Sequence, residues 1–223
     1  MTKVETRRTN EARRGESQAK ILDAAEALFA TRGFNGVSIK DIANAADVDA
    51  SLLHYYFASK AGLHAAVMAR RADEINSSRL ASMRRYAEAH AGRFTVEGVL
   101  RAYLDPAFAF ARIRGEGRVH YLTLIAQLNS TPAGAIPGAE VTPFDPVIQV
   151  LIEMLRQASP TSSDADLYWF YHMLSGAITV SWAQTGRIDR LSGGLCRSDD
   201  FESIAHHMIA LFAEGLTRPR GDA

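Results

Sequence analysis

The side chains with the clearest chemical potential lie in one short segment, residues 38–57. Ser38 can cap a helix, because its hydroxyl can accept a hydrogen bond from a free backbone N–H and Asp41 follows three places later. Asp49 can cap a second helix and places its negative charge at that helix's positive end. The outer side of the second helix then carries small, hydroxyl, imidazole and phenol groups: Ala50, Ser51, His54, Tyr55 and Tyr56. This layout is typical of a helix-turn-helix motif whose second helix enters the major groove of DNA.

A turn between the two helices is predicted at Asp47 and Val48. The first helix repeats apolar residues at three- and four-residue spacing, at Ile39, Ile42 and Ala43. Asp47 interrupts this spacing, and short polar residues tolerate the left-handed backbone that a tight turn needs. Val48 supplies the apolar residue that fills the inside of the turn.

The outer groups of the second helix suit contacts with bases and with phosphates. Ala50 and Ser51 are small enough to let the helix lie deep in the groove, where a hydroxyl can bind a phosphate or base edge and a methyl group can contact thymine. One side of the same helix must fill a core, and Leu53 and Phe57 are expected there. For Tyr55 two interpretations stay open, a place in that core or a place facing DNA.

A first helix, from about residue 16 to 32, is expected to complete a three-helix head. Its apolar residues form a stripe on one face: Ile21, Leu22, Ala25, Leu28 and Phe29. Gly33 can supply the left-handed position that ends this helix, and Phe34 the apolar contact that accompanies such an end.

Residues 1–15 are polar and lack apolar periodicity, so we expect a disordered arm. Residues 1–20 hold six basic and three acidic side chains, a net charge of +3. A basic arm beside a DNA-binding unit can add phosphate or minor-groove contacts. The alternative, a solvated tail without a role, stays open.

The rest of the chain has helical spacing throughout. A long connector is expected from Ser59 to about His90, and further helices at about 95–114, 118–129, 145–157, 164–185 and 198–216. Asp105 and Pro106 should kink the first of these or begin a new helix, and Ser163 and Ser198 should cap the last two. Loops are expected at 130–142 and 187–197, and a short tail at 218–223. No stretch alternates with period two over the length of a strand, so the fold class is predicted to be all-α.

Composition narrows the function further. The 223 residues are 47% hydrophobic and 22% charged, with 25 basic and 25 acidic side chains, so net charge favours no particular partner. No apolar run would span a bilayer and no secretory signal is expected, which predicts a cytoplasmic protein without a membrane partner. The chain has no nucleophile–base pair at a recognisable spacing, no phosphate-binding glycine loop and no metal cluster, so neither an enzyme nor a cofactor is expected.

The motifs together resemble the TetR family of bacterial transcriptional regulators. The resemblance covers about residues 16–68 and is carried by these residues in this order: the run 21–29, Gly33-Phe34, Asp41-Ile42-Ala43, Val48 and the run 53–60. It implies a DNA-binding head at 16–68 and, at 69–217, a helical body that binds an effector and dimerises. The last two helices, about 164–185 and 198–216, would form the homodimer interface.

The resemblance also implies roles for single residues. Ser38 and Lys40 match positions that contact phosphates from the start of the second helix, and Lys60 matches a phosphate-binding lysine. The matching recognition-helix positions are Ala50, Ser51, His54, Tyr55 and Tyr56. Asp47 stands where the family usually has glycine, although aspartate can still form the turn. Ala50 stands where many members have a polar or basic side chain, which puts one base or phosphate contact in doubt.

For the body, aromatic and polar side chains are the only indication of a ligand site. The candidate ligand-binding residues are Tyr103, Phe108, His120, Tyr121, Gln127, Trp169 and His172. Plain core packing remains the alternative for each aromatic side chain. Small residues at 175–177 and 183 would allow close helix packing, and His206, His207, Leu211 and Phe212 could lie at a dimer seam.

Two remaining features carry little functional weight. Cys196 is the only cysteine, which excludes an internal disulfide, and no cysteine-based zinc site is expected; we interpret it as a bystander thiol rather than a redox sensor. His206 and His207 are adjacent and lack the i, i+4 spacing of a helical metal pair.

The leading hypothesis is a homodimeric repressor that a small lipophilic ligand releases from a palindromic double-stranded operator. The alternative is an architectural or protein-partnered DNA-binding protein without such an effector.

Overall fold

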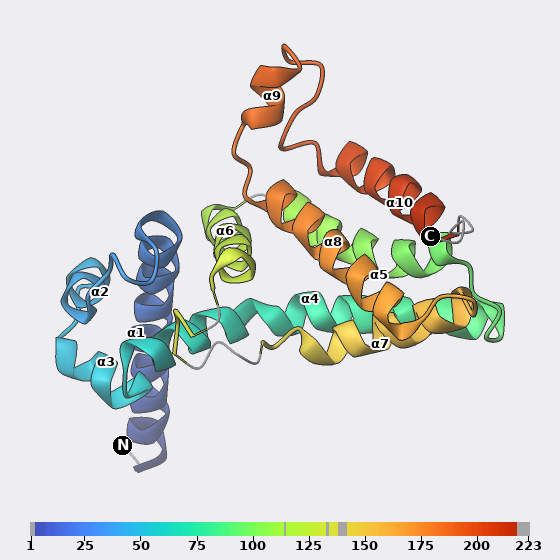
Figure 1. Ribbon diagram of the computed structural model, residues 1–223. Helices are drawn as coiled ribbons and strands as arrows, with labels where there is room; N and C mark the ends of the chain where they lie inside the picture. Colours follow the sequence, from blue (N-terminus) through green and yellow to red (C-terminus); the bar gives the residue numbers. More distant parts are fainter. Residues whose placement is uncertain (1–2, 114, 133, 138–141, 218–223) are drawn as a thin grey trace. The chain divides into compact units, whose positions relative to one another are not determined.

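The computed structural model describes residues 3–113, 115–132, 134–137 and 142–217, and within these ranges it holds ten helices and no strand (Figure 1). The predicted all-α fold is therefore confirmed. The chain divides into two compact units, residues 1–70 with 131–140 and residues 71–130 with 141–223. None of the described helices combines the length and hydropathy that a membrane-spanning segment requires.

The first unit contains α1 (Lys3–Arg32), α2 (Ile39–Ala46), α3 (Ala50–Phe57) and the start of α4 (Lys60–His90). α1 packs on α2, and α2 packs on α3. The enclosed side chains of this core come from all four helices: Ile21, Phe29, Ile42, Leu53 and Leu63. The stripe predicted on the first helix thus supplies part of the core that supports α3.

α1 begins at Lys3, so residues 3–15 are helical and the prediction of a disordered arm there is wrong. Polar residues can extend a helix backwards once its packed part has formed, because propagation is far easier than nucleation. The side chains at 12–16 are exposed, which is why this stretch has no apolar stripe. The other end of α1 is as predicted: Gly33 has φ +71°, and its N–H donates to the Phe29 carbonyl over 2.9 Å.

The second unit contains the rest of α4 with α5 (Val96–Arg112), α6 (Glu116–Ser130), α7 (Asp145–Ala158), α8 (Asp164–Trp182), α9 (Arg187–Leu191) and α10 (Phe201–Thr217). α5 packs on α7 and α10, while α8 packs on α6, α7 and α10. Ser163 caps α8 as predicted, because the Asp166 N–H donates to its hydroxyl over 3.2 Å. The fully enclosed core residues include Leu100, Leu104, Tyr121, Leu151 and Leu174.

For the body, two local predictions need correction and a third is narrowed to one of its alternatives. At Pro106, where the sequence predicts a kink or a new helix, no new helix begins: α5 continues through Pro106, with the buried Leu104 and Ala107 on both sides. A short helix, α9, occupies part of the predicted loop at 187–197. α10 is capped by Asp200 and not by Ser198, because Asp200 accepts hydrogen bonds from the Ser203 N–H and hydroxyl over 3.1 and 2.7 Å.

Candidate nucleic-acid interface

Ser38 and Asp41 form the predicted capping box at the start of α2. The Asp41 N–H donates to Ser38 Oγ over 3.1 Å, and the Ser38 N–H donates to Asp41 Oδ2 over 2.8 Å. Hydrogen bonds from the Ser38 side chain and backbone lower the pKa of the Asp41 carboxyl below its ordinary value. The adjacent Lys40 is exposed and forms no ion pair within the described ranges. The start of α2 is therefore held in place by its capping box, and the long cationic side chain of Lys40 lies next to it.

The turn between α2 and α3 has the predicted left-handed residue. Asp47 has φ 53° and ψ 52°, and its N–H is directed to the carbonyls of Ala43 and Asn44. The Val48 N–H donates to the Ala43 carbonyl over 3.1 Å, and Val48 is half-buried. Aspartate thus forms the turn that glycine forms elsewhere in the resembled family.

α3 separates a buried side from an exposed one. Asp49 caps it by accepting a hydrogen bond from the Ser51 N–H over 2.8 Å, and hydrogen bonding to Ser51 lowers the pKa of the Asp49 carboxyl. Leu53 and Phe57 are buried, which confirms their predicted place in the core. Tyr55 is 68% exposed, so the interpretation of Tyr55 as a core residue is wrong.

The outer side of α3 is formed by the five residues predicted for it. Ser51, His54 and Tyr55 are exposed, and Ala50 and Tyr56 are half-buried. The rings of Tyr55 and Tyr56 meet edge to face, with centroids 5.2 Å apart and an interplanar angle of 65°. The arrangement offers hydroxyl and imidazole groups on a surface without a bulky side chain at the helix start.

Arg14 adds a cation to this surface that the sequence did not predict. Its guanidinium carbon lies 5.5 Å from the centroid of the Tyr55 ring and 5.7 Å from that of Tyr56, within cation–π range. Arg14 belongs to the stretch interpreted as disordered, so no position could be assigned to it. The basic surplus of residues 1–20 was the only signal available in the sequence.

Lys60 is held by backbone groups of the first unit. Its ammonium donates to the carbonyls of Phe34 and Val37 over 3.0 and 2.9 Å, and it lies 4.3 Å from the centroid of the Phe34 ring. An ammonium has three N–H donors, so one remains for a further acceptor. Lys60 therefore joins the α1–α2 loop to the start of α4, whatever else it binds.

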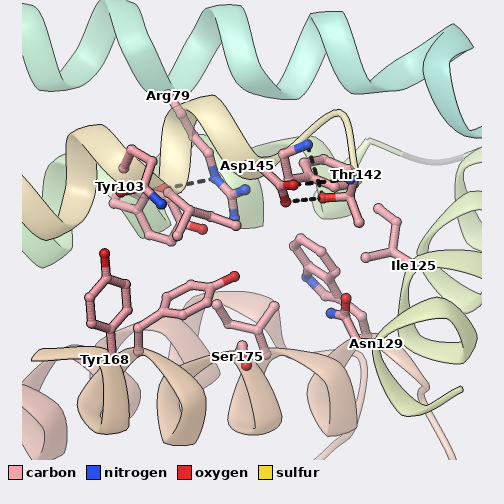
Figure 2. Close-up of a pocket in the computed structure, with 14 residues that line it drawn as sticks. Arg79, Tyr103, Ile125, Asn129, Thr142, Asp145, Tyr168 and Ser175 are labelled. Carbon is pink, nitrogen blue, oxygen red and sulfur yellow. Dashed lines mark hydrogen bonds between the residues drawn. The ribbon is translucent and has the colours of Figure 1, made fainter. Parts of the chain in front are cut away.

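The second unit contains a cavity of about 310 Å³ (Figure 2). Its walls come from α4, α5, α6, α7, α8 and the segment before α7; eight of the fourteen lining residues are aromatic or aliphatic and six are polar or charged. The lining includes Arg79, Tyr103, Asn129, Asp145, Tyr171 and Trp182. Small-ligand sites combine apolar walls with polar groups in this way, and the volume lies near the lower end of their range of about 300–1,000 Å³.

The cavity brings in one of the seven residues predicted to bind a ligand, Tyr103. The other six lie outside its lining. Phe108 and Tyr121 are buried, His120 and Gln127 are half-buried on α6, and Trp169 and His172 are exposed on α8. No pattern in the sequence indicated Arg79, since a single arginine in a long helix is usually a solvated residue. Among the described residues, no cluster of three or more His, Cys, Asp or Glu side chains could hold a metal ion.

Comparisons with families of known proteins agree with this division of the chain. A family model described as bacterial regulatory proteins, tetR family, matches residues 21–67. A second family model, described as the tetracyclin repressor-like C-terminal domain, matches residues 101–215. The first match contains the helix-turn-helix, and the second contains most of the helices that line the cavity.

Two curated relatives match shorter stretches. The probable HTH-type transcriptional regulator YttP of Bacillus subtilis is 46% identical over 44 residues, which are 20% of this chain and 21% of that protein. The HTH-type transcriptional activator FasR of Mycolicibacterium smegmatis is 35% identical over 71 residues, 32% of each chain. The matches thus span between a fifth and a third of these relatives.

Similar solved structures cover almost the whole chain. A putative tetR family transcription regulator from Shewanella sp. PV-4 has a TM-score of 0.63 at 17% identity and covers 91% of this chain and 99% of its own. HlyIIR, a hemolysin II transcriptional regulator, has a TM-score of 0.60 at 19% identity and covers 92% and 99%. At these identities the likeness establishes the fold.

Proposed function

Because the chain belongs to the TetR family of bacterial transcriptional regulators, we propose that it is a homodimeric repressor that leaves a palindromic operator when a small ligand binds its body. Family membership makes it a DNA-binding regulator and not an enzyme. The observation that carries the proposal is the exposed outer side of α3, which is capped at its start and backed by the buried Leu53 and Phe57. We assign the DNA-binding head to residues 16–68 and the effector-binding and dimerisation body to 69–217, in a cytoplasmic protein.

In this proposal α3 lies in the major groove. Ser51 and His54 contact base edges or phosphates, and Ala50 contacts a thymine methyl group. Tyr55 and Tyr56 donate to phosphates or bases at the edge of the same surface. The start of α2 meets the backbone, where Ser38 and Lys40 bind phosphate and the helix dipole favours the negative charge.

Net charge contributes nothing to DNA affinity here, since basic and acidic residues are equal in number. Affinity must therefore come from individual cations of the head. Lys40 is exposed, Lys60 keeps one free donor, and Arg14 lies beside the tyrosine pair. Dimerisation doubles each of these contacts.

An apolar face on the body supports a homodimer. Trp169, Met173 and Val180 follow each other at spacings of four and seven along α8, and all three are exposed. Gly176 lies between them and would allow a partner helix to approach closely. Leu211 of α10 is exposed as well. A self-complementary face of this kind suits a two-fold axis, which in turn requires a roughly palindromic operator.

The cavity in the body supports ligand control over the architectural alternative. A ligand that binds one arrangement of the two heads more tightly than the other would shift the population away from operator binding. The direction of regulation is open to a second candidate, activation, because one relative is named a transcriptional activator.

The test combines genomic DNA selection with a promoter reporter. Purified full-length protein should enrich fragments that share a palindrome with half-sites about one helical turn apart. A reporter fused to the enriched promoter should be less active when the protein is present, and higher activity would overturn repression in favour of activation. Enrichment without any palindrome would contradict the dimeric mode of binding.

A matched pair of variants tests the α3 surface. Ser51→Trp should abolish binding to the selected operator, because the bulky ring keeps α3 out of the groove. Ser77→Trp, an equally exposed change on α4, should leave binding within about twofold of the original. Both variants should keep their helical circular dichroism. Operator binding by Ser51→Trp would show that α3 does not lie deep in the groove.

A further inference from the structure

Arg79 is a buried cation on the wall of the cavity in the body. Its side chain is 3% exposed, and Figure 2 shows it extending from α4 toward the space above Tyr168 and Ser175 of α8. Its Nε–H donates to the Tyr103 carbonyl over 3.2 Å. The guanidinium carbon lies 4.1 Å from the centroid of the Tyr103 ring and 5.9 Å from that of Trp182. Aromatic faces and one carbonyl are thus its immediate partners.

No acid lies within ion-pair distance of this guanidinium in the described ranges. Arg79 forms no ion pair there, and one neutral hydrogen bond leaves the terminal nitrogens with unused donors. Asp145 also lines the cavity (Figure 2), but its oxygens accept hydrogen bonds from Thr142: Oδ2 from the N–H over 3.2 Å and Oδ1 from the hydroxyl over 2.6 Å. A buried charge without a partner is unfavourable, so this position favours an anion supplied from outside.

Two neutral donors stand in the same cavity lining. Trp182 is buried, and its indole Nε1–H has no hydrogen-bond partner in the described part of the chain. Burial raises the pKa of Tyr171 far above its ordinary value, so its phenol keeps the proton that it can donate. A guanidinium fork with N–H and O–H donors beside it matches the acceptor geometry of a carboxylate.

We propose that the effector of this protein is a small organic carboxylate, with its acid group on Arg79 and its apolar part against the aromatic and aliphatic walls. This inference rests on the proposed function, in which the body binds an effector. It narrows the ligand from any lipophilic molecule to one with an anionic end. The cavity volume of about 310 Å³ has room for a single ring or a short chain.

Asp145 makes the proposal more specific. If the ligand is a carboxylate, Asp145 repels it, so Asp145→Asn should tighten acid binding while an amide can still accept from Thr142. If Asp145 were instead the functional counter-ion of Arg79 for a neutral ligand, the same change would weaken binding. The two interpretations therefore predict opposite signs.

The experiment is isothermal titration of the full-length protein without DNA. The probes are benzoate, phenylacetate, hexanoate and octanoate, each compared with its own primary amide. At least one acid should bind about tenfold more tightly than its amide, since a hydrogen-bonded charge pair distinguishes them. Arg79→Gln should lose that preference, and Arg101→Gln, which removes an exposed arginine of α5 paired with Glu97, should keep it. Equal binding of acid and amide, or no binding of any acid, would overturn the proposal.

Trp182→Phe keeps the test decisive if Arg79→Gln does not fold. This change removes the unpartnered N–H and part of the buried ring but keeps an aromatic side chain, so the variant should fold with a lowered ligand-free melting temperature. Acid affinity should drop roughly two- to tenfold, as expected for one lost hydrogen bond. Unchanged acid affinity in a folded Trp182→Phe variant would contradict the proposed hydrogen bond from the Trp182 indole to the ligand.

Operator binding is measured separately on the same preparations. Acids that bind the protein but leave an intact operator complex would support the carboxylate site and contradict ligand-controlled release. An operator complex released by neutral molecules, with no acid bound, would support the proposed function and overturn the carboxylate inference. The two failures are thus distinguishable.

Discussion

Lys60, a proposed phosphate-binding residue, also has a structural role in the head. Its ammonium donates to the carbonyls of Phe34 and Val37, so removing it leaves both acceptors short of a donor. Lys60→Met should lower the free energy of unfolding by about 1–3 kcal/mol, the range for hydrogen bonds to a charged group in a half-buried setting. Chemical denaturation of both proteins at equal concentration measures this difference.

Lys40→Met is the matched control for Lys60→Met. Lys40 is exposed and forms no ion pair in the described part of the chain, so stability should stay within about 0.5 kcal/mol. If Lys40 binds a phosphate, the slope of log affinity against log salt should decrease by about one. A stability loss as large as that of Lys60→Met would contradict the exposed position of Lys40.

The burial of His64 in the head predicts that folding stability depends on pH. Its ring is 5% exposed and lies 5.3 and 5.4 Å from the rings of Phe29 and Phe34, and burial lowers its pKa below the ordinary value of 6.5. The unfolded chain therefore binds a proton at a higher pH than the folded chain. The stabilising contribution is complete above about pH 6.5 and is lost as the pH falls toward the lowered pKa.

His64→Phe should remove this dependence, because the replacement is apolar and cannot titrate. The difference in unfolding free energy between the two proteins should begin to change as the pH falls below about 6.5, with a slope that corresponds to the uptake of at most one proton. Denaturation series at several pH values would reveal it. The other six histidines remain in both proteins and cancel in the comparison. A difference that is flat with pH would contradict burial of the imidazole.

At the scale of elements, two residues near the start of α10 are candidates for its N-cap. Asp200 accepts hydrogen bonds from Ser203, whereas the Ser198 N–H donates to Asp189 Oδ2 over 3.0 Å. Asp200→Ala should lower the melting temperature measurably, since it exposes the first free N–H groups of the helix. Ser198→Ala should change it little, because its contact comes from the backbone. A larger fall in melting temperature for Ser198→Ala than for Asp200→Ala would show that Ser198 is the cap.

The helix-turn-helix could be predicted from the sequence because its determinants are local. The capping box at Ser38, the left-handed Asp47 and the cap at Asp49 act within about ten residues, where spacing alone fixes which groups meet. The position of Asp200 shows the limit even for local patterns. Serine and aspartate both cap helices, and the contacts of α9, which the sequence did not predict, decide which of them does so.

The cavity could not be predicted for a different physical reason. Arg79, Tyr103, Asp145 and Tyr171 come from α4, α5, α7 and α8, and only the packing of these helices brings them together. Aromatic residues in helices of mixed burial have the same spacing whether they line a cavity, fill a core or face solvent. Tyr103, Tyr121 and Trp169 show all three outcomes.

For the whole molecule, the proposed homodimer would join head and body through a monomer–dimer equilibrium. One head presents a single α3 surface, and two are needed to read both half-sites of a palindrome. Under this proposal, a monomer would lose most of its operator affinity without any change in the head. Substitutions on the exposed face of α8 would then test assembly separately from the α3 surface.

Val180→Asp tests this link, because Val180 is 69% exposed and belongs to the apolar face with Trp169 and Met173. A carboxylate there would be buried and repelled by its symmetry mate, so the dimer dissociation constant should rise at least about tenfold. Sedimentation at several concentrations measures this change, and operator affinity should fall with it. Val119→Asp, on the exposed apolar Val119 of α6, should leave both unchanged. A monomeric Val180→Asp protein that still binds the full operator tightly would separate dimerisation from DNA recognition, whereas a dimer as stable as the original would move the interface away from α8.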